Sequence, residues 1–114
     1  MKKYAMYIGR WQNFHDGHKW LIDQQLKKGK NIWIAIRNVQ KDSNNPKTGG
    51  EVLMELSKNP YILENNIYVS IIPDIESVNY GRDVGYEVIE HFPPENVKEI
   101  SGTKIREKNK FTSQ

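Results

Sequence analysis

Short apolar runs alternate along this chain with longer stretches of mixed character. Three runs are apolar at nearly every position and have the length of strands, a pattern typical of a parallel sheet buried on both faces. These runs are residues 4–8, 31–36 and 67–72. Residues 86–92 form a fourth candidate strand, which the following Pro-Pro pair prevents from continuing. The pattern predicts a sheet of three or four strands.

The stretches between these runs predict helices. The first is expected to begin at Asp16, a residue type that favours the N-cap, and to end near Gly29. A short helix is expected over residues 51–56, closed by an Asn-Pro breaker, and a last one from Ser101 to about residue 108. Residues 38–50 predict a polar loop. Strands alternating with helices favour a mainly parallel α/β sheet with right-handed crossovers, in a single domain over residues 1–114.

Composition narrows the class of protein. The 114 residues are 37% hydrophobic, enough for one small core, and the absence of cysteine excludes disulfide scaffolds and thiol catalysis. A net charge of +3 favours phosphate-bearing partners, but no nucleic-acid motif or dense basic stripe is present, so we expect no nucleic-acid partner. No apolar run approaches the roughly 18 residues of a membrane span, and the N-terminus has no signal-peptide pattern. These features predict a cytoplasmic protein with no membrane partner.

The first group of candidate chemical residues follows the first predicted strand, where the chain reads Gly-Arg-Trp-Gln-Asn-Phe-His-Asp-Gly-His over residues 9–18. Gly9 permits a close approach of the backbone to a ligand. His15 and His18 are three residues apart at a helix start, so their side chains point the same way. Beside the free amides of that helix they could hold a phosphate. The spacing alone is equally compatible with surface histidines.

The second group lies over residues 100–106, which read Ile-Ser-Gly-Thr-Lys-Ile-Arg. Ser101 and Thr103 offer hydroxyls beside free amides at a helix start, and Arg106 can reach back toward an anion. Taken alone, this segment is also compatible with an ordinary capped surface helix.

Both groups resemble signatures of the HIGH-motif nucleotidyltransferases. Residues 9–18 resemble GRFQPFHxGH, with Asn13 where that family usually has proline, and residues 100–106 resemble ISxTxxR. A softer match covers residues 45–51, which resemble the NPFTxGER stretch of the nicotinamide mononucleotide (NMN) adenylyltransferases. In that stretch Lys47 replaces a phenylalanine and Val52 replaces an arginine.

The resemblance implies a small Rossmann-like, doubly wound fold and a reaction. A nucleoside monophosphate, AMP from ATP, is transferred to a small phosphorylated acceptor such as NMN, and pyrophosphate is released. Mg²⁺ is expected to arrive on the nucleotide and not on protein ligands. The implied catalytic residues are His15, His18 and Arg106. The implied nucleotide-binding residues are Gly9, Arg10, Trp11, Gly17, His18, Ser101, Gly102, Thr103 and Arg106. The candidates for binding the acceptor are Arg10, Lys19, Arg37 and Arg82.

Several alternatives remain open at this point. The shortness of the chain also fits a cytidylyltransferase that uses CTP and an alcohol or sugar phosphate. A nucleotide-binding module without turnover is a further possibility. Exposed aromatic residues such as Trp33 favour a homodimer or a larger homo-oligomer, because one short chain has a thin core.

Overall fold

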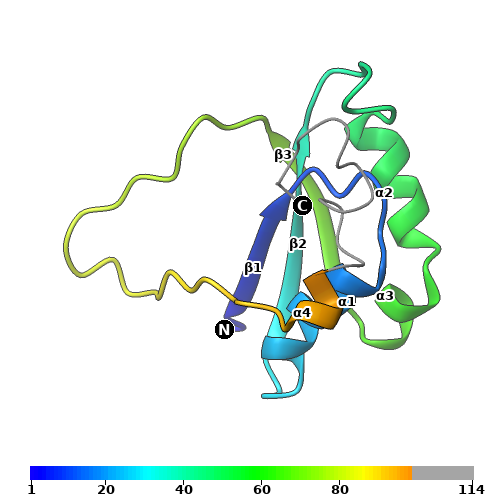
Figure 1. The fold of residues 1–114 in the computed structure, drawn as a ribbon. Coiled ribbons are helices and arrows are strands. Elements are labelled where there is room, and N and C mark those ends of the chain that lie inside the picture. Colours follow the sequence, from blue (N-terminus) through cyan, green and yellow to red (C-terminus); the bar gives the residue numbers. More distant parts are fainter. Residues whose placement is uncertain (99–114) are drawn as a thin grey trace.

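The computed structural model describes residues 1–98 of the chain. It contains three strands and four helices (Figure 1). The strands are β1 (Tyr4–Gly9), β2 (Asn31–Asn38) and β3 (Tyr68–Pro73). The helices are α1 (Asp16–Leu26), α2 (Gly49–Ser57), α3 (Pro60–Glu64) and α4 (Glu95–Lys98). The predicted last helix over residues 101–108 lies outside the described residues.

The strands form one parallel sheet in the order β1-β2-β3, which confirms the predicted parallel α/β architecture. The chain moves across the sheet in one direction. Right-handed crossovers therefore place the connecting helices on the same face, and Figure 1 shows α1, α2 and α3 on that side. The loops that follow the three strands consequently meet at one edge of the sheet, where ligands of such folds bind.

The core lies between the sheet and these helices. Alternate residues of β2, Ile32, Ile34 and Ile36, are almost fully buried on the helical face. They pack in one cluster with residues of the helices that include Ile22 and Leu56. A strand so enclosed holds its carboxyl end firmly, and that end carries the loop of residues 39–48.

The fourth strand predicted over residues 86–92 is wrong. These residues belong to an irregular segment between β3 and α4, and all but His91 are exposed. Figure 1 shows this segment swinging away from the sheet on the face opposite α2 before it returns to α4. A strand needs a neighbour for its backbone hydrogen bonds, and among the described residues this path offers none.

Helix α2 ends at Ser57, before the Asn-Pro pair, as predicted, but the pair also begins α3, a helix that the sequence did not predict. The Asn59 side chain accepts hydrogen bonds from the backbone N–H groups of Tyr61 and Ile62, and Pro60 occupies the first helical position. Proline is favoured there because its fixed φ suits a helix and its missing N–H has no partner in the first turn.

Tyr7 provides a test of this packing. Its hydroxyl donates to the carbonyl oxygen of Leu21 at 2.6 Å, and burial raises its pKa from 10.0 to about 12. The folded state thus holds the phenol proton more tightly, so this stabilisation is complete below pH 10 and is lost as the pH rises toward 12. Between about pH 9 and about pH 11, we expect the unfolding free energy of Tyr7→Phe to fall by about 1–2 kcal/mol less than that of the unaltered protein. Urea unfolding of both proteins at about pH 9 and about pH 11 measures it, and equal losses would contradict the assignment.

Candidate functional site

Helix α1 begins with a capping box made of two histidines. The N-cap is His15, and not Asp16 as the sequence predicted. Its Nδ1 accepts a hydrogen bond from the backbone N–H of Gly17 at 3.0 Å, while its own backbone N–H donates to Nδ1 of His18 at 3.2 Å. His15 takes the cap because its ring nitrogen reaches an amide two residues ahead, which leaves Asp16 at the first helical position.

These hydrogen bonds fix the proton positions on both rings. Each Nδ1 acts as an acceptor, so each neutral imidazole carries its proton on Nε2. The two rings stack with centroids 3.9 Å apart. His18 is buried and also lies against Trp11 and Phe14. The pair thus holds two N–H groups at the positive end of an eleven-residue helix, a position that favours an anion.

Trp11 anchors the loop between β1 and α1. Its side chain is only 1% exposed, and its φ of +53° lies in the left-handed region, which is uncommon for a bulky residue. Such a conformation costs about 1–3 kcal/mol and persists only where the surroundings enforce it. Because the side chain lies in the core, it does not face a nucleotide. A contact between the nucleotide and the Trp11 backbone stays a prediction.

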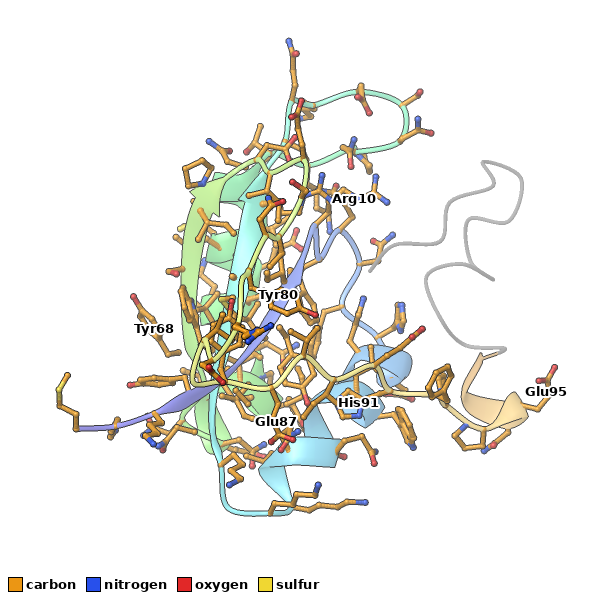
Figure 2. The ribbon with its side chains drawn as sticks, turned by 90° about the vertical axis from the view of Figure 1, so that its left-hand side faces the viewer. Arg10, Tyr68, Tyr80, Glu87, His91 and Glu95 are labelled. Atoms are coloured by element: carbon orange, nitrogen blue, oxygen red, sulfur yellow. The ribbon has the colours of Figure 1, made fainter. Side chains whose placement is uncertain are left out.

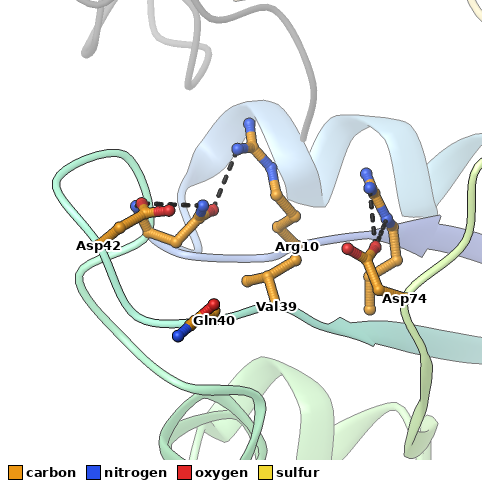
Figure 3. Close-up of a pocket in the computed structure, with 7 residues that line it drawn as sticks. Arg10, Val39, Gln40, Asp42 and Asp74 are labelled. Carbon is orange, nitrogen blue, oxygen red and sulfur yellow. Dashed lines mark hydrogen bonds and ion pairs between the residues drawn. The ribbon is translucent and has the colours of Figure 1, made fainter.

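Arg10 lines an open cavity of about 400 Å³ beyond the carboxyl ends of the strands (Figure 3). Arg10 is only 6% exposed, and its guanidinium donates from Nη1 to Asn45 Oδ1 at 3.0 Å. Asn45 is held in turn by Asp42, whose Oδ1 accepts from both its side chain and its backbone. The cavity is lined by Arg10, Arg37, Val39, Gln40, Asp42, Asn45 and Asp74.

Arg37 reaches the same cavity from the end of β2. Its Nε and Nη2 both lie 2.8 Å from Asp74 Oδ1, which places the pair across the carboxyl ends of β2 and β3. Figure 3 shows this pair beside Arg10. The structure therefore brings together two of the four arginine and lysine side chains predicted to bind the acceptor.

Sequence reasoning gave no role to Gln12, which ties two loops together. Its side-chain N–H donates to the carbonyl of Lys47 at 3.0 Å, and its Oε1 accepts from the N–H of Lys47 at 2.9 Å. Gln12 is 1% exposed. The position of Gln12 within the signature of residues 9–18 was the one sequence feature that could have indicated this role. With the bond from Arg10 to Asn45, this clamp gives a physical reason for the Asn-Pro-Lys-Thr stretch at the end of the polar loop.

The remaining predicted residues lie in several parts of the chain. Gly9 and Gly17 are buried at the end of β1 and the start of α1. Lys19 pairs with Asp16 at 3.6 Å, and Arg82 belongs to the irregular segment; neither lines the cavity. Ser101, Gly102, Thr103 and Arg106 lie outside the described residues, and their predicted roles stay predictions.

Comparison with known proteins adds several archaeal relatives of the same name. A nicotinamide-nucleotide adenylyltransferase of Methanococcus vannielii is 32% identical over 130 aligned positions, which cover 91% of this chain and 76% of the relative. Proteins of the same name from Methanococcus aeolicus and Thermoplasma acidophilum are 39% and 29% identical, over 63% and 94% of this chain. No family model matches the chain, and no solved structure matches it.

The chain belongs to the nicotinamide-nucleotide adenylyltransferase family. This confirms the resemblance inferred from the two signatures. The chain covers 43% of the length of the M. aeolicus relative, and about three quarters of each of the other two.

The alignments also show that this chain is internally shorter than its relatives. The alignment with the M. vannielii protein has 130 positions. This chain contributes 91% of its 114 residues, or about 104 residues, so about 26 residues of the relative are aligned with gaps in this chain. The 136 positions aligned with the T. acidophilum protein require gaps in the same way. Part of the family's scaffold therefore has no counterpart here.

Two further observations concern metal ligands and membrane-spanning helices within residues 1–98. No group of three or more histidine or carboxylate side chains in that range could hold a metal ion. No helix in the same range is long and apolar enough to cross a membrane.

The Gln12 clamp is testable by stability. Replacing Gln12 with alanine removes both hydrogen bonds and leaves the Lys47 backbone groups without these partners, so we expect a loss of about 1–3 kcal/mol in unfolding free energy. Gln24→Ala is the matched control, since Gln24 makes a single bond to Trp20 within its own helix. Urea titrations of the two variants compare them, and equal losses would refute the stabilising role of the clamp.

Proposed function

We propose that this chain transfers the adenylyl group of ATP to the phosphate of nicotinamide mononucleotide, or of a closely similar acceptor, with release of pyrophosphate. The observation that carries the proposal is the pair His15 and His18, with both Nε2–H donors fixed at the start of α1. The names of the relatives support the same reaction class. Arg10, in the loop that connects β1 to this helix, adds a buried positive charge beside the cavity.

The proposed reaction needs no strong general base, because the attacking group is already an anion. An oxygen of the acceptor phosphate forms a bond to the α-phosphorus of ATP, and the bond from that phosphorus to the bridging oxygen of the β-phosphate breaks. The electron pair leaves with pyrophosphate. Catalysis then consists of aligning the two reactants and stabilising the charge that develops on the transferred phosphoryl oxygens.

The histidines suit this task because neutral donors fixed in advance need no reorganisation when charge develops. In the proposal, Nε2–H of each ring donates to the phosphates, and Thr103 and Arg106 hold the β- and γ-phosphates. Mg²⁺ would arrive on the triphosphate, whose charge it neutralises, keeping most of its water ligands.

The acceptor is assigned to the cavity at the strand ends. Arg37 contributes a positive charge there, and its ion pair with Asp74 fixes the guanidinium on the cavity wall. An incoming phosphate would share this guanidinium with Asp74, since arginine can donate to two anions through different N–H groups.

The catalytic assignment is tested by His18→Asn. The amide oxygen of asparagine can replace Nδ1 as the acceptor of the His15 N–H, while the Nε2 donor is lost. We expect kcat for NMN and ATP to fall by about 100-fold or more, as for the loss of one oxyanion donor. His91→Asn, in the irregular segment, is the control. Pyrophosphate release measures turnover, and unchanged turnover in a folded His18→Asn protein would refute the assignment.

The nucleotide is tested in the same assay by replacing ATP with CTP. The proposal expects a dinucleotide product from ATP and NMN, and a much lower kcat/KM with CTP. Binding of ATP by calorimetry without any product from NMN would instead indicate a nucleotide-binding module. A preference for CTP would favour the cytidylyltransferase alternative.

The positions of two arginines predicted to bind the acceptor lead to different expectations for their substitution. Arg37 lines the cavity and Arg82 does not, so we expect Arg37→Gln to raise KM for NMN by about tenfold, as for one charge-assisted hydrogen bond, and to leave KM for ATP nearly unchanged. Arg82→Gln is the matched control and should change neither value. A larger effect of Arg82→Gln would contradict the placement of the acceptor.

A further inference from the structure

On the face of the sheet opposite the helices, the half nearer the amino ends of the strands is apolar and partly exposed among the described residues. The register places Tyr4 and Met6 of β1, Trp33 of β2 and Tyr68 of β3 on this face, since it sets Met6 beside Trp33 and Trp33 beside Tyr68. Tyr4, Met6 and Tyr68 are 44%, 46% and 51% exposed. The rings of Tyr4 and Trp33 each lie 5.9 Å from that of Tyr68. We call these four residues the open face.

An uncovered face is unusual for this kind of sheet. Parallel sheets are normally covered on both sides, and β2 carries the apolar residues Trp33 and Ala35 on the face opposite its buried isoleucines. The relatives have about two dozen aligned positions that this chain lacks. The chain therefore keeps the apolar residues of a two-sided sheet while having less polypeptide to cover them.

The irregular segment of residues 76–92, here called the arm, is a second apolar surface on the same chain. Figure 1 shows the arm standing off on the side of the open face, and Figure 2 views that side directly, with Tyr68 on the sheet and Tyr80, Glu87 and His91 along the arm. Its large apolar side chains are exposed by 36–77%. They are Val78, Tyr80, Val84, Tyr86, Val88, Ile89 and Phe92.

The exposed area is what a stable dimer needs. Taking about 200 Å² for a fully exposed large side chain, the open face and the arm together leave about 1,000 Å² of side-chain surface uncovered on each chain. Stable protein interfaces bury about 800 Å² per partner. One chain thus carries enough apolar surface to form a dimer with another copy of itself.

The charges of the two surfaces are also complementary. The arm is acidic, with one arginine among four carboxylates, namely Glu76, Asp83, Glu87 and Glu90. The amino ends of β1 and β2, which border the open face, are basic. Their lysines are Lys2, Lys3 and Lys30. An arm laid across the open face of another chain would bring these opposite charges together, which favours association and its orientation.

We propose that two copies of this chain form a symmetric dimer in which the arm of each covers the open face of the other. In a two-fold dimer the same contact occurs twice, so an arm and a face on one chain are sufficient for closure. The interface lies on the side of the sheet away from α1, α2 and α3.

Crosslinking tests the predicted contact directly, because the chain has no cysteine. Met6→Cys on the open face and Tyr86→Cys on the arm are made in separate chains, tagged differently, mixed and oxidised. We expect a mixed disulfide between the two chains. Met54→Cys on α2, where Met54 is 59% exposed, replaces Met6→Cys in the control and should give little product. Equal yields from the two pairs would overturn the proposal.

Sedimentation equilibrium provides the second test. The unaltered chain is expected to have twice the mass of one chain, and Met6→Lys and Tyr86→Ser are each expected to weaken the dimer at least tenfold, whereas Met54→Lys leaves it intact. Tyr86→Ser lies outside regular structure, so it tests the contact even if Met6→Lys does not fold. A monomer would overturn the proposal, even if the chain's own residues cover the open face and shield the thiol of its Met6→Cys variant. A dimer that survives both substitutions would also overturn it.

Discussion

The burial of Trp11 in a left-handed backbone conformation is the constraint on which the site depends. Because this side chain is held in the core, the residues on either side of it must point elsewhere. Arg10 is turned to the cavity at the strand ends, and Gln12 is turned to the Lys47 backbone. Trp11 also packs on His18, so the same anchor supports the histidine pair. One strained residue thus sets the direction of the chemical groups before it and after it.

The two loops around the cavity consequently behave as one unit. Arg10 and Gln12 each reach across about 35 residues of sequence to a different part of the loop after β2. The carboxylate of Asp42 holds Asn45, which in turn accepts from Arg10. A buried guanidinium is costly to desolvate, and this relay offsets part of that cost through a neutral amide. The relay also fixes the direction of the guanidinium, so its positive charge is held at the wall of the cavity.

Local sequence predicted the three parallel strands well, because each carries a nearly continuous apolar run, and Gly9 and Pro73 mark the ends of β1 and β3. The same signals predicted a fourth strand over residues 86–92, which the structure does not contain. The sequence predicted local structure poorly where the same residues can occur in two different structural positions. The Asn-Pro pair before α3 can end or begin a helix, and the Asn59 side chain decided the outcome by capping α3. His15 replaced Asp16 as the cap through a hydrogen bond that depends on ring orientation. The Gln12 clamp joins residues 35 apart, a distance at which no local pattern carries information.

The position of the site explains how a shortened chain can retain it. The described groups lie on the loop after β1, the start of α1 and the ends of β2 and β3, and Trp11 and Ile36 in the core on the helical face support the loop after β1 and the end of β2. The open face lies on the other side of the sheet, and its exposure changes none of those contacts. Exposure of apolar residues on that side therefore costs solubility and hydrophobic stabilisation more than it costs the geometry of the site. A second chain can restore the lost burial, because covering an apolar face demands area and charge complementarity, whereas aligning a phosphate demands fixed positions within a single loop.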